Sequence, residues 1–85
     1  MKLREHDISW QEIDEEIVIM DLASSKYLKL NGSGADLWRQ LAEGASRDEL
    51  VNWLVSGYDV DARRAGRDVD EFLRRLTESK LIEAV

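Results

Sequence analysis

The stretch from Ser25 to Leu30, followed at once by Asn31 and Gly32, constrains the fold of this 85-residue chain more than any other. Polar and apolar residues alternate through it, which is the period of a strand with one buried face. The Asn-Gly pair ends the strand where a helix can begin. We therefore expect Lys26–Leu30 to be the last strand of a small sheet. If no other part of the chain covers its far side, its outer N–H and C=O groups are free to pair with another peptide.

Two strands are predicted before this one, which gives an antiparallel sheet of three. Residues Ile17–Leu22 carry the strongest strand signal, because they are rich in β-branched side chains and are bounded by polar residues. Residues Leu3–Trp10 alternate more weakly and form the expected first strand. The polar residues Gln11–Glu16 are the expected turn between these two strands, and Ala23–Ser25 closes a hairpin into the third strand.

Three helices are predicted to follow, because apolar residues after Ser33 recur at helical spacing. The first helix has Asn31 or Ser33 as its N-cap and Gly44 as its stop signal. The second helix opens at Ser46 with Glu49 three residues later, which is the pattern of a capping box. It is expected to run to about residue 57.

The third helix is the longest, capped by Asp61 and running to about Ser79, with one apolar face formed by Ala65, Val69, Phe72, Leu73 and Leu76. A short apolar tail, Leu81–Val85, is expected to pack back on the core. Strands first and helices second favour an α+β fold, a three-stranded antiparallel sheet followed by three helices. The short break between the second and third helices fits a winged helix-turn-helix arrangement.

Composition places the chain among globular proteins, with 44% hydrophobic and 35% charged residues, and its length suits one domain over residues 1–85. No apolar run is long enough to span a membrane, and the N-terminus lacks the apolar core of a signal peptide. We therefore expect a cytoplasmic protein without a membrane partner. The net charge of −6 repels phosphate backbones, so binding to nucleic acid would need a local basic patch.

Catalytic and metal-binding motifs are missing from the sequence. The sole histidine, His6, is read as an ordinary strand residue, and Gly32-Ser33-Gly34 as a strand-to-helix turn that is too short to cradle a phosphate. Asp14-Glu15-Glu16 lacks the spaced ligands of a calcium loop and is read as a solvated turn. With no cysteine, disulfides and thiol catalysis are excluded. We expect neither an enzyme nor a bound cofactor or metal.

Four tryptophan and tyrosine residues carry more information. Trp38 and Trp53 occupy apolar positions of their helices and are expected in the core, whereas the place of Trp10 is left open. Tyr27 lies on the opposite face of its strand from Leu28, so it should project away from the helices. It is either a half-exposed strand residue or part of a surface that binds a partner.

The third helix carries five arginines, Arg63, Arg64, Arg67, Arg74 and Arg75. They could contact phosphates as in a DNA-recognition helix. Acidic residues are interleaved with them, however, so pairs such as Arg64 with Asp68 and Glu71 with Arg75 can neutralise each other on a solvent-facing surface. A third alternative is a flank that faces a bound peptide.

Four segments in this order and spacing carry a resemblance to a known family: Val18–Asn31 with its Tyr-x-x-Leu-Asn ending, Gly34–Trp38, Gly57–Asp61 and Asp68–Leu73. Over nearly all its length the chain resembles the PqqD-like family of small winged helix-turn-helix proteins known as RiPP precursor recognition elements. It most resembles the leader-binding half of the split B protein in lasso-peptide biosynthesis.

The resemblance implies a non-catalytic adaptor that binds the leader of a ribosomally made precursor and presents it to a separate leader peptidase, and to a macrolactam-forming cyclase. In the family the leader adds as a strand beside the third strand, in a cleft closed by the third helix. Carried onto this sequence, the implied peptide-binding residues are Lys26, Tyr27, Leu28, Lys29, Leu30, Arg64, Asp68, Phe72 and Arg75.

Other functions stay open at this point. A DNA-binding winged-helix regulator would bind duplex in a salt-sensitive way through the third helix. A structural subunit would bind a partner enzyme but not a free leader. The same open edge could also pair two copies of the chain into a homodimer.

Overall fold

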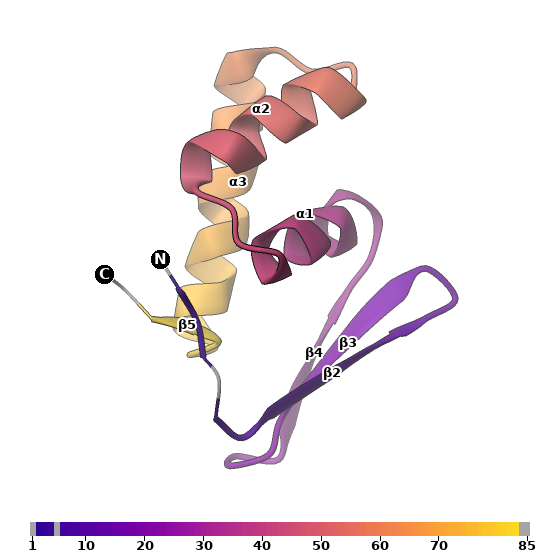
Figure 1. Ribbon diagram of the computed structural model, residues 1–85, viewed down its shortest axis with the longest axis vertical. Helices are drawn as coiled ribbons and strands as arrows, with labels where there is room; N and C mark the ends of the chain where they lie inside the picture. The colour runs from indigo at the N-terminus through magenta and orange to yellow at the C-terminus, as the bar shows by residue number, and fades with distance from the viewer. Residues whose placement is uncertain (1, 5, 84–85) are drawn as a thin grey trace.

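The computed structural model describes residues 2–4 and 6–83 and shows three helices gathered on one side of a small sheet (Figure 1). The order of three strands followed by three helices is confirmed, with one short strand added at each end. The elements are β1 (Lys2–Leu3), β2 (Ile8–Ile13), β3 (Glu16–Asp21), β4 (Lys26–Leu30), α1 (Gly32–Ala42), α2 (Arg47–Gly57), α3 (Ala62–Glu78) and β5 (Ile82–Glu83).

The first strand of the sheet differs from the prediction. It begins at Ile8 rather than Leu3 and continues to Ile13, through residues expected to form a turn, and His6 precedes it. The turn consists of Asp14 and Glu15 alone, both with positive φ (51° and 69°), as in the tight hairpin turns whose twist matches that of the strands. The polar residues before this turn lie on an edge strand and are exposed, so their polarity did not interrupt the strand.

The sheet has the antiparallel order β2-β3-β4, so β4 is an edge strand. Within the described part of the chain, β3 is the only strand that pairs with β4. The tail does not cover the free edge, because β5 pairs with β1 instead. Leu81 and Ile82 are buried, as expected for the tail, whereas residues 84–85 lie outside the described residues.

The core lies between the sheet and the helices. Ile17, Ile19 and Leu30 contribute from the sheet, and every helix adds buried side chains. Trp38 is fully buried as predicted, but Trp53 is only partly buried at the margin of the core. Trp10 is 41% exposed and packs edge-on against Trp38, with ring centroids 5.9 Å apart. This aromatic contact packs β2, the first strand of the sheet, against α1.

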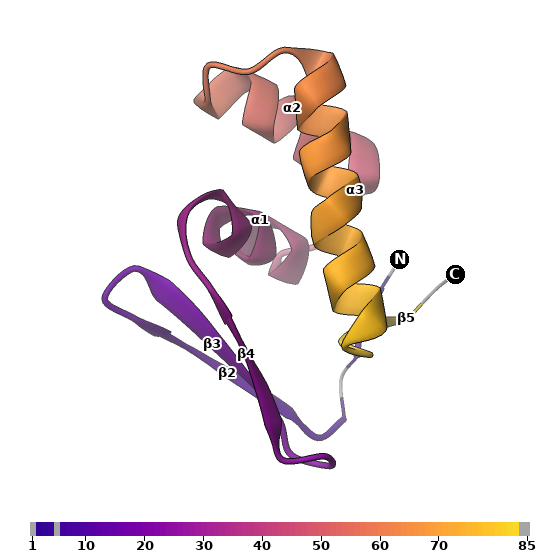
Figure 2. The same cartoon turned by 180° about the vertical axis from the view of Figure 1, so that it is seen from behind.

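The helix boundaries follow the predicted signals. Ser46 and Glu49 form the capping box of α2, and the Asp61 side chain accepts a hydrogen bond from the Arg64 N–H at the start of α3. Asn31, rather than Ser33, is the N-cap of α1, although its side chain makes no capping hydrogen bond. Together α2 and α3 form the helix-turn-helix pair, which Figure 2 shows from behind.

Candidate functional site

The β2–β3 turn determines which backbone groups of β4 point to the free edge. The two residues that flank a two-residue turn form a hydrogen-bonded pair. Successive residues along the strand then direct their N–H and C=O groups alternately to the strand on one side and to the strand on the other. Counted from the turn, Leu22 bonds toward the β2 side, as its N–H bond to the Asp7 carbonyl shows. Ile19 therefore bonds toward β4, where it pairs with Leu28. Tyr27 and Lys29 direct their N–H and C=O groups to the free edge.

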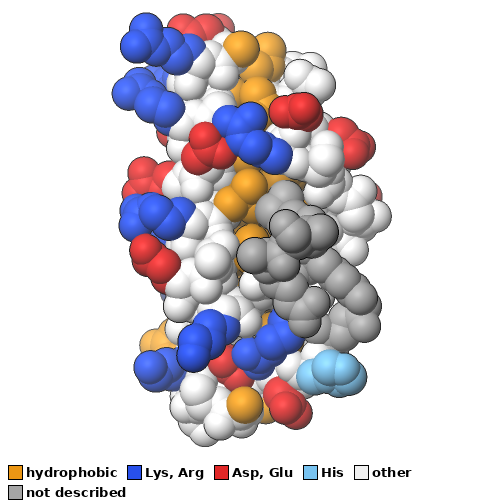
Figure 3. All heavy atoms as spheres, turned by 90° about the vertical axis from the view of Figure 1, so that its left-hand side faces the viewer, with side chains coloured by type: hydrophobic (Ala, Val, Ile, Leu, Met, Phe, Trp, Pro, Cys, Tyr) orange, Lys and Arg blue, Asp and Glu red, His pale blue; other side chains and the backbone are white. Residues whose placement is uncertain are grey.

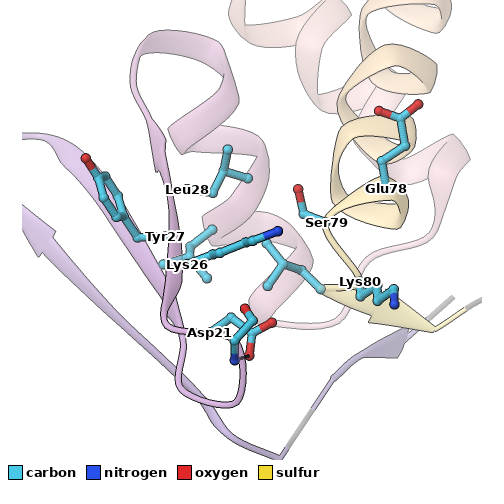
Figure 4. Close-up of a pocket in the computed structure, with 10 residues that line it drawn as sticks. Asp21, Lys26, Tyr27, Leu28, Glu78, Ser79 and Lys80 are labelled. Carbon is cyan, nitrogen blue, oxygen red and sulfur yellow. Dashed lines mark hydrogen bonds between the residues drawn. The ribbon is translucent and has the colours of Figure 1, made fainter.

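A groove runs between β4 and α3, and we call it the β4–α3 groove. At the hairpin end it widens into a cavity of about 310 Å³ lined by residues from both sides, among them Lys26, Leu28, Ser79 and Leu81. Figure 4 shows Lys26 and Leu28 directed toward the end of α3, while Tyr27 points away from it. Leu28 and Leu81 give the floor of this cavity an apolar character.

A second cavity, of about 430 Å³, opens at the other end of the groove. It is lined by Leu30 and Leu37 beneath the middle of α3, and by Asp68, Phe72 and Arg75 of that helix. Phe72 is only 5% exposed, so its ring belongs to the core although it also lines this cavity. The two cavities together extend the groove along the whole length of β4.

Eight of the nine residues implied by the resemblance line these cavities: Lys26, Tyr27, Leu28, Lys29, Leu30, Asp68, Phe72 and Arg75. Arg64 lines neither cavity and lies one turn before Asp68, which it approaches at 3.9 Å. Leu37, Glu71 and the tail residue Leu81 also line the groove, and the sequence analysis did not predict them there. Their contribution depends on how α1, α3 and the tail pack together, which no local pattern encodes.

The charges on the groove are unevenly paired. Lys29 forms an ion pair with Glu16 at 2.8 Å, whereas Lys26 and Arg75 have no ion-pair partner among the described residues. The predicted pair of Glu71 with Arg75 is not formed, because Glu71 contacts Arg74 at 3.5 Å instead. Arg75 thus presents an unneutralised guanidinium at the mouth of the second cavity, where it can bind a carboxylate.

An ion pair braces the hairpin below the first cavity. The Arg4 guanidinium donates a hydrogen bond of 2.7 Å to Asp21, which lines this cavity. This bond is the main cause that lowers the pKa of Asp21 to about 2. Asp21 also accepts a hydrogen bond from the Ala23 N–H, and Arg4 donates to the Lys80 carbonyl. One arginine therefore links the N-terminal segment, the hairpin and the tail.

Basic side chains on α3 do not gather into one patch. Asp70 forms an ion pair with Arg47 of α2 at 2.6 Å, and Arg74 pairs with Glu78 at 3.0 Å. The Arg47 contact lowers the pKa of Asp70. On the face shown in Figure 3, Lys and Arg side chains are interspersed with Asp and Glu side chains. Interleaved charges of this kind give little attraction for a phosphate backbone.

Neither a metal-site cluster nor a membrane-spanning helix occurs among residues 2–4 and 6–83, which the structure describes. Among them no three His, Cys, Asp or Glu side chains are grouped as a metal site would require. None of the helices in this part of the chain combines the length and apolar character needed to cross a membrane.

An open edge strand beside a helix-walled groove is the arrangement of modules that bind extended peptides by strand addition. Residues 16–82 match the family described as coenzyme PQQ synthesis protein D (PqqD). The chain belongs to this PqqD family. No curated protein sequence matches the chain closely enough to count as a relative.

Two solved structures resemble the chain over nearly its whole length. One is TbiB1 in complex with the TbiA(beta) leader peptide, with 32% sequence identity and a TM-score of 0.93, covering 100% of this chain and 98% of that chain. The other is a lasso peptide synthetase B1 complexed with the leader peptide, with 29% identity and a TM-score of 0.88, covering 98% and 96%. The resemblance found in the sequence is thereby confirmed.

Proposed function

We propose that this chain is a leader-peptide adaptor of lasso-peptide biosynthesis, which binds the leader of a ribosomally made precursor as an added strand along β4. The observation that carries the proposal is the free edge of β4 running beside the β4–α3 groove. The two similar proteins of known structure, each complexed with a leader peptide, support it. The guest strand is expected to be antiparallel to β4, continuing the pattern of the sheet.

Backbone pairing alone is too weak to account for binding. Tyr27 and Lys29 offer four outward groups, and each hydrogen bond contributes about 1 kcal/mol net. Association costs at least about 4 kcal/mol, while micromolar affinity requires about −8 kcal/mol. Apolar leader side chains must therefore enter the groove, where each buried side chain contributes about 1.5–3 kcal/mol. The hydrogen bonds determine the register of the leader, and the two cavities supply affinity and selectivity.

The adaptor acts without catalysing a reaction, as a single recognition domain over residues 1–85 in the cytoplasm. It presents the leader to a separate peptidase, and to a macrolactam-forming cyclase. The leader would occupy the free edge of β4, so leader binding and the pairing of two copies through their β4 edges exclude each other.

Titration of the purified chain with the synthetic leader encoded beside its own gene tests this function. Saturable binding at micromolar concentration is expected, and absence of binding at tens of micromolar would contradict it. Duplex DNA at low salt is the control for the alternative class. A mobility shift that disappears as salt is raised would favour a DNA-binding regulator instead.

A further inference from the structure

The face of the sheet turned away from the helices carries an exposed apolar strip. The strip consists of the exposed side chains of Ile13 on β2, Met20 on β3 and Tyr27 on β4, together with the half-buried Val18 of β3. Tyr27 lies directly opposite Met20 across the β3–β4 pair, and the exposed fractions of their side chains are 71% and 45%. We call these four residues the outer strip. Its Tyr27 end lies at the free edge of β4, next to the place of a guest strand.

A guest strand on β4 necessarily reaches the outer strip as well as the groove. Side chains of neighbouring strands that lie beside each other share a face of the sheet, and successive side chains alternate between faces. A leader residue beside Leu28 enters the groove, whereas the residue beside Tyr27 lies on the outer face. Figure 4 shows these two side chains of β4 directed to opposite sides.

We propose that the leader is read on both faces of the sheet, and that an apolar or aromatic leader side chain packs on Tyr27 at the edge of the outer strip. This inference rests on the proposed leader-binding function and adds a rule for the leader sequence. Between two residues that enter the groove, the leader carries one apolar residue that covers Tyr27. Cross-strand pairs of an aromatic with an apolar residue stabilise sheets, and Tyr27 has no such partner on its free side.

A second copy of this chain fits the outer strip less well. Two strands of six residues and one of five, about 4.8 Å apart and rising about 3.3 Å per residue, cover only roughly 270 Å². A stable protein–protein interface buries about 800 Å² on each partner. The charged side chains of Glu16 and Lys29, which form an ion pair, share this face with the outer strip. The guest strand, by contrast, is already adjacent to Tyr27 and needs no further area.

The test compares two matched substitutions, Tyr27→Thr and Ile13→Thr. Both remove an exposed apolar side chain from the outer strip and leave a residue with good strand propensity, so the fold is retained. Only Tyr27 lies at the β4 edge beside the proposed guest strand, since Ile13 is on β2, the opposite edge strand of the sheet. The probe is a fluorescein-labelled synthetic leader from the precursor encoded beside this gene, with the TbiA(beta) leader peptide as a second probe.

We expect Tyr27→Thr to raise the Kd of the leader about three- to tenfold, and Ile13→Thr to change it less than twofold. An alanine scan of the leader should then find one position whose loss weakens binding to the wild type but not to Tyr27→Thr. Such coupling identifies the residue that packs on Tyr27.

Three results separate the possible failures. If the wild type binds neither leader peptide, the proposed function itself is wrong. If the wild type binds but Tyr27→Thr binds equally well, the leader does not contact the outer strip and the present inference is overturned, while the function stands. If Ile13→Thr weakens binding as much as Tyr27→Thr, the contact is not confined to the edge and the inference is likewise overturned.

Discussion

At the scale of single residues, Asp21 does more for the groove than its place at a strand end suggested. Its carboxylate accepts hydrogen bonds from Arg4 at 2.7 Å and from the Ala23 N–H at 3.0 Å. The first bond ties the hairpin to the N-terminal segment, and the second stabilises the turn that leads into β4. One carboxylate at the wall of the first cavity therefore links the N-terminal segment to the hairpin turn.

Stability should depend on pH through Asp21. Because its pKa is lowered to about 2 in the folded protein, from about 3.9 in an unfolded chain, its contribution is complete above pH 4 and is lost as the pH falls toward 2. The free energy of unfolding of Asp21→Asn should thus lie below that of the wild type at pH 5, and the difference should shrink between pH 4 and pH 2. Urea unfolding at several pH values measures this difference.

The matched control for this experiment is Asp59→Asn, which removes one negative charge from an exposed turn residue. Its effect on stability should be small at pH 5. A difference between Asp21→Asn and the wild type that stays constant down to pH 2 would contradict the role given to the Arg4 ion pair.

Arg75 is the groove residue whose charge is best placed to bind the leader. It lines the second cavity and has no ion-pair partner among the described residues. We expect Arg75→Ala to raise the Kd of the leader about tenfold without changing the melting temperature, since the side chain is exposed. Fluorescence anisotropy and thermal unfolding of the same samples provide the two measurements.

Arg63→Ala is the control for Arg75→Ala, because it removes the same charge from the same helix outside both cavities. Equal weakening by the two substitutions would mean that only the overall charge of α3 matters. The specific contact proposed for Arg75 would then be wrong.

At the scale of elements, β4 can act as a template because only two of its residues, Tyr27 and Lys29, turn their backbone groups outward. The tight β2–β3 turn fixes this alternation through the register of the two hairpins. Each element thus has a separate role: the strand determines register, and α3 supplies the wall of the groove.

The alternation predicts the response to N-methylation of the leader backbone. An N-methyl group removes the N–H donor, so methylation of a residue opposite Tyr27 or Lys29 should weaken binding about tenfold or more. Methylation of the residues between them should have much less effect, because their N–H groups point away from β4. A scan of singly methylated leaders should therefore show a period of two, and equal sensitivity at every position would contradict strand addition.

The N-methylation scan also bears on the proposal that the leader contacts both faces of the sheet. In an antiparallel pair, the leader residues that donate to β4 have their side chains on the outer face. The leader position coupled to Tyr27 should consequently be one of the positions sensitive to N-methylation.

At the scale of the whole molecule, the two ends of the chain together complete the groove. β1 pairs with β5, and the Arg4 N–H donates a hydrogen bond of 2.9 Å to the Leu81 carbonyl. Leu81 is 2% exposed and lines the first cavity as well as belonging to the core. The tail is therefore part of both the fold and the binding surface.

Truncation of the buried tail residue should be costly. We expect Leu81→Ala to lower the free energy of unfolding by about 2–4 kcal/mol, because it leaves a cavity in the core. Leu22→Ala, the same substitution at a 55% exposed position, should lower it by less than about 1 kcal/mol. Urea unfolding compares the two variants, and similar losses would show that the tail adds little to the core.

Features that depend on neighbours along the chain could be predicted from the order of the amino acids alone. Capping signals placed α2 and α3, and the alternating residues before Asn31 placed β4 to the residue. Its register placed Tyr27 on the face away from the helices, and the exposure of Tyr27 agrees. These features rest on hydrogen bonds and side-chain periods within a few residues, which a single chain segment encodes.

Features that depend on contacts between distant segments became apparent only in the folded molecule. The first strand of the sheet was misplaced, because its pairing with β3 and the contact of Trp10 with Trp38 outweigh its polar composition. The pairing of β1 with β5 leaves the β4 edge free, and Leu81 joins the groove by the same packing. Both the free edge and the cavities beside it result from packing between residues that are far apart in the sequence. A local sequence pattern does not specify which distant segments come into contact.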